Sequence, residues 1–302
     1  MLDYQIYFQP ERGLWLEFSD PVEYLVTAET GEVQTLLELI SHRVEAEHLY
    51  AAGWVAYEAA SGLDKALVTN DPGGGPLLEF CLYRSVRELP ELPSQIPGWS
   101  PAGGEEQHHS AGWSVAGRFD QVAHGDAVRR IKQYLRSGDS YQVNYTQKLA
   151  LNWSGHSSDL FRQMVAAQPG SYSAYLCSDQ RVISSVSPEL FFSLNGEQIV
   201  CRPMKGTAAR GLGSMADQES AEMLFRSPKE RAENLMVVDM IRNDLGRIAV
   251  TGSVAVKRLF ELERYPTVWQ MTSTVTAQTN RNLAEIFSAL FPCASIVGAP
   301  KR

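Results

Sequence analysis

Four short apolar segments follow one another between residues 171 and 202, and their spacing constrains the fold of this chain strongly. They read SYSAYLC, RVISSVS, ELFFSLN and EQIVCR, and only a few residues separate each segment from the next. Connections this short join antiparallel strands, whereas parallel strands need a crossover of a dozen or more residues. The spacing therefore predicts an antiparallel sheet and, with the helices expected elsewhere, an α+β fold rather than a strictly alternating α/β fold.

Composition excludes several classes of protein. The chain has 302 residues, 44% of them hydrophobic, and a net charge of -8 without any basic run, which argues against a nucleic-acid partner. No apolar stretch approaches the roughly 20 residues of a membrane span, and the N-terminus lacks the pattern of a signal peptide. We therefore expect no membrane partner and a cytoplasmic location. The four cysteines are far apart and form no CxxC pair, so neither a zinc site nor a disulfide framework is expected.

The sequence divides into three regions, residues 1–88, 89–112 and 113–302. The first has a helical pattern at 33–44 between strand-like segments. The second contains four prolines, then glycines and charges, and is predicted to be a linker or a long loop. The third begins with a predicted helix that ends near Gly138, and its apolar face would be formed by Val128, Ile131 and Leu135.

The stretch SPKERAENLMVVDMIRNDLGR, residues 227–247, predicts a helix with a well-marked start. Ser227 can cap the helix, Pro228 suits its first position, and Glu230 is spaced to complete a capping box. Gly246 supplies a stop signal. An apolar stripe is predicted from residues three and four apart: Leu235, Val238, Ile241 and Leu245.

Two charged groups near this helix each have two interpretations. Glu230 and Glu233 lie one helical turn apart, and two such carboxylates can hold Mg2+ through their oxygens. The ordinary alternative is a helix cap beside a solvated charge, and spacing alone favours it. The loop RPMKGTAARG, residues 202–211, is basic and contains glycine, but it lacks the spacing of a phosphate-binding loop. Its residues alone modestly favour an ordinary solvated loop.

Six stretches, taken together, resemble the chorismate-utilising enzymes in their order and spacing. They are GDSYQVNYTQ, SPELFF, RPMKGTAARG, SPKERAENLMVVDMIRNDLGR, ERYPTVWQMTSTV and FPCASIVGAPKR. The family includes anthranilate, aminodeoxychorismate, isochorismate and salicylate synthases. The resemblance covers essentially the whole chain and implies two antiparallel β-sheets packed face to face, with helices outside, as in anthranilate synthase component I. The active site would lie in the cleft between the sheets.

Within the family, the chain most resembles component I of the aminodeoxychorismate synthases, because Lys205 stands before the Gly-Thr pair where most other members have alanine. The resemblance implies that Lys205 attacks C2 of chorismate. Ammonia from a glutamine amidotransferase, component II, would then attack C4 and give 4-amino-4-deoxychorismate, on the route to p-aminobenzoate and folate. This chemistry needs a neutral amine, with a pKa well below the ordinary value of about 10.4. Arg202 and Arg210 are close enough in sequence to contribute to that shift.

The resemblance also assigns the other site residues. Glu189 matches a general acid near the leaving hydroxyl, and Gly206 and Thr207 match a loop that contacts the substrate. Glu233 matches a ligand of Mg2+, with Glu230 flanking it, and the ion would hold the ring carboxylate of chorismate.

Two glutamines matter for the reaction type. Gln142 stands where isochorismate and salicylate synthases carry a lysine base for water, so water is disfavoured as the nucleophile. Gln270 stands where many members have histidine, and it can hydrogen-bond substrate but cannot carry a proton.

Several alternatives stay open at this point. Segments around Ser19 and Tyr172 resemble those that form a tryptophan pocket in some relatives, but they could equally be ordinary core strands. Family members continue beyond the GAPKR motif, so the resemblance predicts that the C-terminal part of the fold and half of the metal site are missing. The rival functions are therefore anthranilate synthase component I and a non-catalytic, truncated homologue that acts as a binding subunit.

Overall fold

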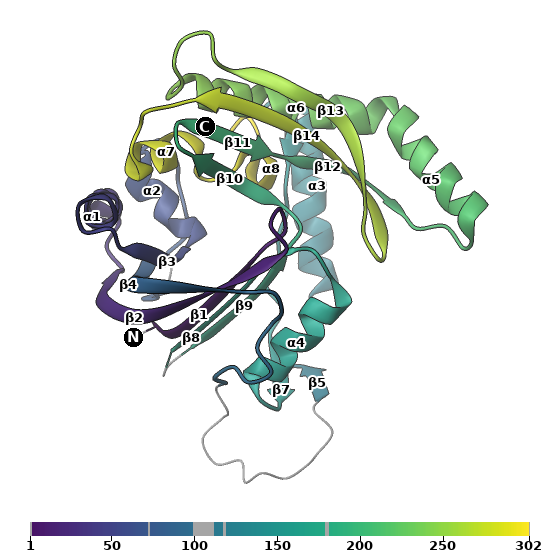
Figure 1. The fold of residues 1–302 in the computed structure, drawn as a ribbon. Coiled ribbons are helices and arrows are strands. Elements are labelled where there is room, and N and C mark those ends of the chain that lie inside the picture. The colour runs from purple at the N-terminus through teal and green to yellow at the C-terminus, as the bar shows by residue number, and fades with distance from the viewer. Residues whose placement is uncertain (1, 72, 99–111, 117–118, 179–180, 302) are drawn as a thin grey trace.

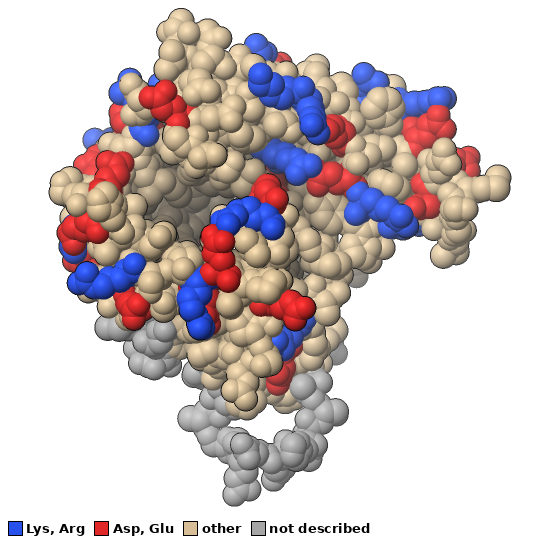
Figure 2. All heavy atoms as spheres, in the orientation of Figure 1, with Lys and Arg blue, Asp and Glu red and all other residues tan. Residues whose placement is uncertain are grey.

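The computed structural model describes residues 2–71, 73–98, 112–116, 119–178 and 181–301. Two large antiparallel sheets lie opposite one another, and helices pack around them (Figure 1). The molecule is hollowed between the sheets on the side shown in Figure 2, where acidic and basic side chains lie beside the hollow. No helix in the described part of the chain is long and apolar enough to cross a membrane.

The first sheet has six strands in the order β3-β4-β2-β1-β8-β9. It combines strands from residues 1–88 with strands from residues 113–302, because β1 pairs with β2 on one side and with β8 on the other. Residues 1–88 therefore do not form a sheet of their own. The strands are β1 (Leu2–Gln9), β2 (Leu14–Thr27), β3 (Tyr50–Val55), β4 (Leu78–Leu89), β8 (Tyr172–Ser178) and β9 (Val182–Ser187).

The second sheet has five strands arranged around β14, which pairs with β11 and β12 along one edge and with β13 along the other. Every pairing is antiparallel, so the prediction from hairpin spacing is confirmed. Pro203 separates β11 from β12. The strands are β10 (Leu190–Asn195), β11 (Gln198–Arg202), β12 (Met204–Ala209), β13 (Ala255–Arg264) and β14 (Val268–Gln278).

Helices and short strands connect the sheets. The helices are α1 (Val33–Glu47), α2 (Ala60–Leu63), α3 (Gln121–Ser137), α4 (Ser157–Ala167), α5 (Ser214–Arg226), α6 (Pro228–Gly246), α7 (Leu283–Leu290) and α8 (Ala294–Val297), with 3-10 turns η1 (Thr30–Glu32) and η2 (Tyr57–Ala59). Two small ladders pair β5 (Gly112–Val115) with β7 (Leu151–Ser154), and β6 (Gln142–Val143) with β15 (Gly298–Ala299).

Helix α6 packs against the second sheet, and the two form one apolar cluster together with α7 and α8. The predicted stripe is correct for Val238, Ile241 and Leu245 but wrong for Leu235, which is 44% exposed. Val237 is buried instead. The capping box is only half formed, because the Ser227 hydroxyl accepts from the Glu230 N–H while the Ser227 N–H already donates to Leu224 at the end of α5.

Helix α3 forms as predicted, and Asp120 caps it by accepting from the Ala123 N–H. Its expected apolar face is not part of the core, since no residue of α3 is buried in the described structure and Leu135 is exposed. In the region predicted to be a linker, β4 continues to Leu89 and Ile96 is buried beside the first sheet. Residues 99–111 of that region lie outside the described residues.

Candidate active site

Lys205 lies on a bulge in β12. Met204 pairs with Thr272 and Thr207 pairs with Gln270, so Lys205 and Gly206 together lie opposite the single residue Met271. Gly206 has φ +106°, a conformation that side chains disfavour. A Cβ at Gly206 would lie 3.1 Å from the Met271 Cβ and 3.4 Å from the Glu230 Cβ. Glycine is therefore required both by the backbone and by the close approach of α6.

Glu189 lies in the turn between β9 and β10 and reaches the same bulge. Its Oε1 accepts from the Met204 N–H at 3.3 Å and from the Ser295 hydroxyl of α8 at 2.5 Å. Burial raises the pKa of Glu189, although the bonds from Ser295 and Met204 and the nearby charge of Lys205 act in the opposite direction. The structure thus places the predicted acid against the backbone of Met204, the residue before the predicted nucleophile.

A cavity of about 290 Å³ opens beside Glu189, between the two sheets. Its walls come from β3 and η2 on one side and from β10 and the α7–α8 turn on the other: Val55, Tyr57, Ser187, Glu189, Phe191, Phe291, Pro292, Cys293 and Ile296. Glu189 therefore lines a space between the sheets, and its role as a general acid stays a prediction.

Thr207 and Gln270 lie side by side on β12 and β14. The Thr207 hydroxyl donates to Gln270 Oε1 at 3.1 Å. Thr207 is exposed, so both polar groups remain within reach of a ligand beside the bulge. Sequence spacing of 63 residues gave no sign of this contact, which the antiparallel register of the two strands creates.

Glu230 and Glu233 lie at the start of α6 and converge on one positive charge. Glu230 Oε1 and Glu233 Oε1 lie 3.3 Å and 3.7 Å from Lys229 Nζ, and Glu230 and then Glu233 raise the pKa of that lysine. The described residues contain no cluster of three or more His, Cys, Asp or Glu that could hold a metal. Mg2+ often takes only one or two protein carboxylates, and two that already share a cation fit that pattern.

The two arginines expected to influence Lys205 are neutralised by carboxylates. Arg202 pairs with Glu263 of β13 at 2.5 Å. Arg210 binds Asp217 of α5 through two nitrogens, at 2.5 Å and 2.6 Å, and its guanidinium stacks on Trp269. Because each positive charge is matched by a negative one, the structure gives these arginines a structural role rather than a role as cations acting on Lys205.

Gln142 lies on β6 and is joined to the end of the chain. It pairs with Ala299 of β15, and this approach requires glycine at 298, because a Cβ there would lie 2.3 Å from the Gln142 carbonyl oxygen. Gln142 Oε1 is buried and accepts no hydrogen bond from the described residues. Since β15 directly follows α8, the helix that carries Ser295, Gln142 is connected to Glu189 through this turn.

Ser19 and Tyr172 have different hydrogen-bond partners. The Ser19 hydroxyl lies 2.8 Å from that of Ser85, whereas Tyr172 donates to Glu11. Tyr172 also lines a cavity of about 340 Å³ with Leu16 and Phe18, and Ser19 is not part of its wall. A tryptophan site at Tyr172 stays a prediction.

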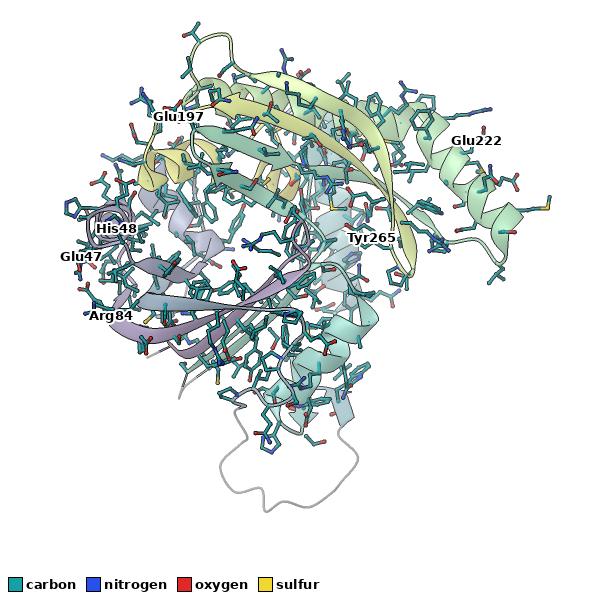
Figure 3. All side chains as sticks on the ribbon, viewed as in Figure 1. Glu47, His48, Arg84, Glu197, Glu222 and Tyr265 are labelled. Carbon is teal, nitrogen blue, oxygen red and sulfur yellow. The ribbon has the colours of Figure 1, made fainter. Side chains whose placement is uncertain are left out.

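Three residues of this region were not anticipated from the sequence. Ser295 gave no local signal, because it binds Glu189 across 106 residues. Asn234 did give one, since it precedes Val237, Val238 and Ile241 at core positions of the α6 pattern, where a polar side chain needs buried partners. Tyr265, labelled in Figure 3, lies in the turn between β13 and β14. It also joins this region, because its hydroxyl donates to Glu263 at 2.8 Å and to the Pro188 carbonyl at 3.4 Å.

A family model described as "chorismate binding enzyme" matches residues 3–302. The chain belongs to this family of chorismate binding enzymes. Aminodeoxychorismate synthase component 1 of Escherichia coli (strain K12) is 43% identical over 180 residues, which are 59% of this chain and 40% of that protein. Its counterpart from Bacillus subtilis (strain 168) is 37% identical over 218 residues, 72% of this chain and 44% of that one. This chorismate binding enzyme thus spans less than half the length of these relatives.

Solved structures confirm the predicted fold. Anthranilate synthase component I from Streptococcus pneumoniae TIGR4 matches 100% of this chain and 73% of its own, with a TM-score of 0.72 and 22% identity. A 2,3-dihydroxybenzoate-specific isochorismate synthase from Bacillus anthracis matches 98% of this chain and 74% of its own, with a TM-score of 0.73 and 16% identity. Two facing antiparallel sheets with outer helices are therefore the architecture of this chorismate binding enzyme.

Proposed function

We propose that this chain aminates chorismate to 4-amino-4-deoxychorismate. The observation that supports the proposal best is that Glu189, whose pKa is raised by burial, binds the Met204 N–H next to Lys205, which lies on a glycine-containing bulge. A nucleophilic amine beside a carboxylic acid that can hold a proton suits a displacement in which a hydroxyl group leaves. The similarity to aminodeoxychorismate synthase component 1 points to the same reaction.

Lys205 acts as the nucleophile in this proposal. Its neutral amine forms a bond to C2 of the ring, both ring double bonds shift by one position, and the bond from C4 to its hydroxyl oxygen breaks. Glu189 gives its proton to that oxygen, so the group leaves as water. Ammonia then forms a bond to C4, both double bonds shift back, and the bond between C2 and Lys205 breaks, which restores the amine. One proton of the added ammonia returns to Glu189.

The remaining side chains bind and orient the substrate. Thr207 and Gln270 present a hydroxyl and an amide beside the bulge and can hydrogen-bond the ring substituents. Gln142 is neutral and cannot act as a base for water, which favours ammonia as the incoming group. Glu230 and Glu233 would hold Mg2+, which when bound supplies positive charge for the substrate carboxylate.

The source of ammonia is part of the proposal. Relatives named component 1 imply a second component, and we propose that a glutamine amidotransferase subunit supplies ammonia here. Free ammonium salt can replace that subunit in an assay, so the chemistry can be tested without it.

The test is product analysis by mass spectrometry. Purified protein is incubated with chorismate, Mg2+ and an ammonium salt, with and without EDTA. We expect 4-amino-4-deoxychorismate without pyruvate, and we expect Lys205→Ala to abolish it while Lys148→Ala, an exposed lysine outside the site, leaves the rate unchanged. Full activity of Lys205→Ala would contradict the covalent role. No turnover by a folded chain would instead favour a binding subunit.

A second candidate is anthranilate synthase component I. The relative from Thermus thermophilus is 35% identical over 233 residues, or 76% of this chain and 49% of that protein, a larger share of this chain than the Escherichia coli match covers. Anthranilate formation releases pyruvate, so the same experiment distinguishes the two reactions. Lys205 favours the first candidate, because the resemblance places alanine there in most other members.

A further inference from the structure

Asn234 is buried in the first half of α6, and both polar atoms of its side chain form hydrogen bonds. It is 1% exposed. Its Nδ2 donates to the Lys205 carbonyl at 3.1 Å and to the Met271 carbonyl at 3.2 Å. Its Oδ1 accepts from the Ser273 hydroxyl at 2.6 Å. All three partners belong to β12 or β14, so one amide joins the helix to both strands.

The position of these bonds is the important feature. Lys205 and Gly206 form the bulged side of β12, and Met271 is the residue opposite them. A bulge disrupts the ladder and leaves backbone groups that need other partners. Asn234 binds the Lys205 carbonyl, which belongs to the bulge, and the Met271 carbonyl on the opposite strand. Its amide therefore supplies hydrogen bonds where the ladder is interrupted.

The orientation of the Asn234 amide is fixed from the other side. Ser273 Oγ donates to Asn234 Oδ1 and itself accepts from the Phe260 N–H at 3.2 Å. Phe260 has φ +59°, which is unusual for a bulky residue, and the guanidinium of Arg231 in α6 lies 4.6 Å from the centre of its ring. With the oxygen occupied by Ser273, only the NH₂ group can face the two carbonyl groups.

The same helix carries the two carboxylates. Asn234 follows Glu233 directly and lies one turn beyond Glu230, whose Cβ approaches Gly206. A displacement of Asn234 would therefore move the bulge and the carboxylate pair relative to one another.

We propose that Asn234 is a positioning residue that sets Lys205 and Gly206 against Glu230 and Glu233. The role rests on the proposed function, because it concerns the distance between the nucleophile and the carboxylates. Asn234 touches neither substrate nor reacting atoms, and acts through the Lys205 carbonyl.

The first test is hydrogen exchange of the protein without ligand. Asn234→Asp keeps the shape of the side chain but puts an acceptor against two carbonyl oxygens. Asn243→Asp is the matched control, because Asn243 is an exposed asparagine on the same helix. We expect Asn234→Asp to speed exchange in residues 203–209 at least about threefold and Asn243→Asp to leave it unchanged. Unchanged exchange at 203–209, or an equal rise throughout the chain, would overturn the proposal.

The second test separates positioning from binding. A misplaced nucleophile lowers kcat, and a displacement of about 1 Å can cost about 100-fold. We therefore expect Asn234→Asp to lower kcat about 10- to 100-fold with KM for chorismate within about threefold. A rise in KM alone would contradict positioning.

Ser273→Ala provides a milder variant if Asn234→Asp does not fold. It removes only the hydroxyl that orients the amide, and we expect the same local change at 203–209 with a smaller amplitude. If the wild-type protein shows no turnover, the proposed function fails, while the exchange experiment still decides whether Asn234 holds the bulge.

Discussion

The two ends of β12 place a carboxylate in opposite states. At the Met204 end, Glu189 accepts from one N–H and one hydroxyl, and burial raises its pKa. At the Arg210 end, Asp217 binds that arginine through two nitrogens and also accepts from Trp269 and the Gly211 N–H. The arginine, before all other causes, lowers the pKa of Asp217 well below the ordinary range.

The difference shows how the surroundings at the two ends of one strand can shift the pKa values of two neighbouring acids in opposite directions. A carboxylate saturated by donors and a cation stays ionised and fixes α5 against β12 and β14. A buried carboxylate with few donors retains its proton to higher pH and so can give it to a leaving group. Substitutions at the two ends should therefore separate activity from stability.

The largest effect is expected for the activity of Glu189→Gln. Glutamine keeps the shape of the side chain but has no acidic proton for the leaving hydroxyl, so kcat should fall about 100- to 10,000-fold. Steady-state rates of 4-amino-4-deoxychorismate formation measure this loss, and a thermal melt serves as the folding control. Retention of activity within about threefold would remove Glu189 from the mechanism.

Asp217→Asn should produce the next largest effect, on stability rather than on chemistry. The change removes the charge that matches Arg210 and leaves a largely buried guanidinium without its counter-ion, so the unfolding midpoint should fall by several degrees. Thermal unfolding followed by circular dichroism measures it. Asp126→Asn is the control, because Asp126 forms an exposed pair with Arg129, and such pairs contribute about 0–1 kcal/mol. Equal falls of the midpoint would mean that Asp217 contributes no more to stability than an exposed carboxylate.

Arg210→Lys should have a smaller effect than Asp217→Asn. Lysine keeps the positive charge but loses the two-nitrogen contact with Asp217 and the stacking on Trp269. A midpoint between those of wild type and Asp217→Asn is expected in the same melts. A midpoint as low as that of Asp217→Asn would show that geometry, not charge, holds the cluster.

The smallest effects are expected in the pH dependence of stability, and their signs differ. The Asp217 contribution is present above the ordinary carboxyl pKa of 3.8 and is lost as pH falls through the lowered value, so wild type and Asp217→Asn should converge in acid. Ionised Glu189 is disfavoured in the folded state, so wild type should lose stability relative to Glu189→Gln as pH rises from 4.5 through the raised pKa. Denaturant melts between about pH 1 and pH 8 measure both differences. Parallel curves would contradict the assigned pKa directions.

Local patterns in the sequence predicted many of the elements. Hairpin spacing predicted the antiparallel strands from 172 to 202, and cap and stop signals predicted α6. The α6 stripe was wrong at Leu235 because periodicity shows that a helix has a core face but cannot fix its rotation where Asn234 takes a core position. The face of α3 was wrong because an apolar pattern does not show which other element covers it.

The sequence by itself determined the family resemblance, the antiparallel strand pairing and the choice of Lys205, Gly206 and Thr207 as candidate site residues. These depend on residue type and on short spacing. Only the tertiary structure decided the state of each acid and the role of Asn234. Glu189 meets Ser295 across 106 residues, and Asn234 meets Lys205 across 29. A pKa depends on burial and on the donors around a group, and no local pattern specifies which distant donors the fold will bring there.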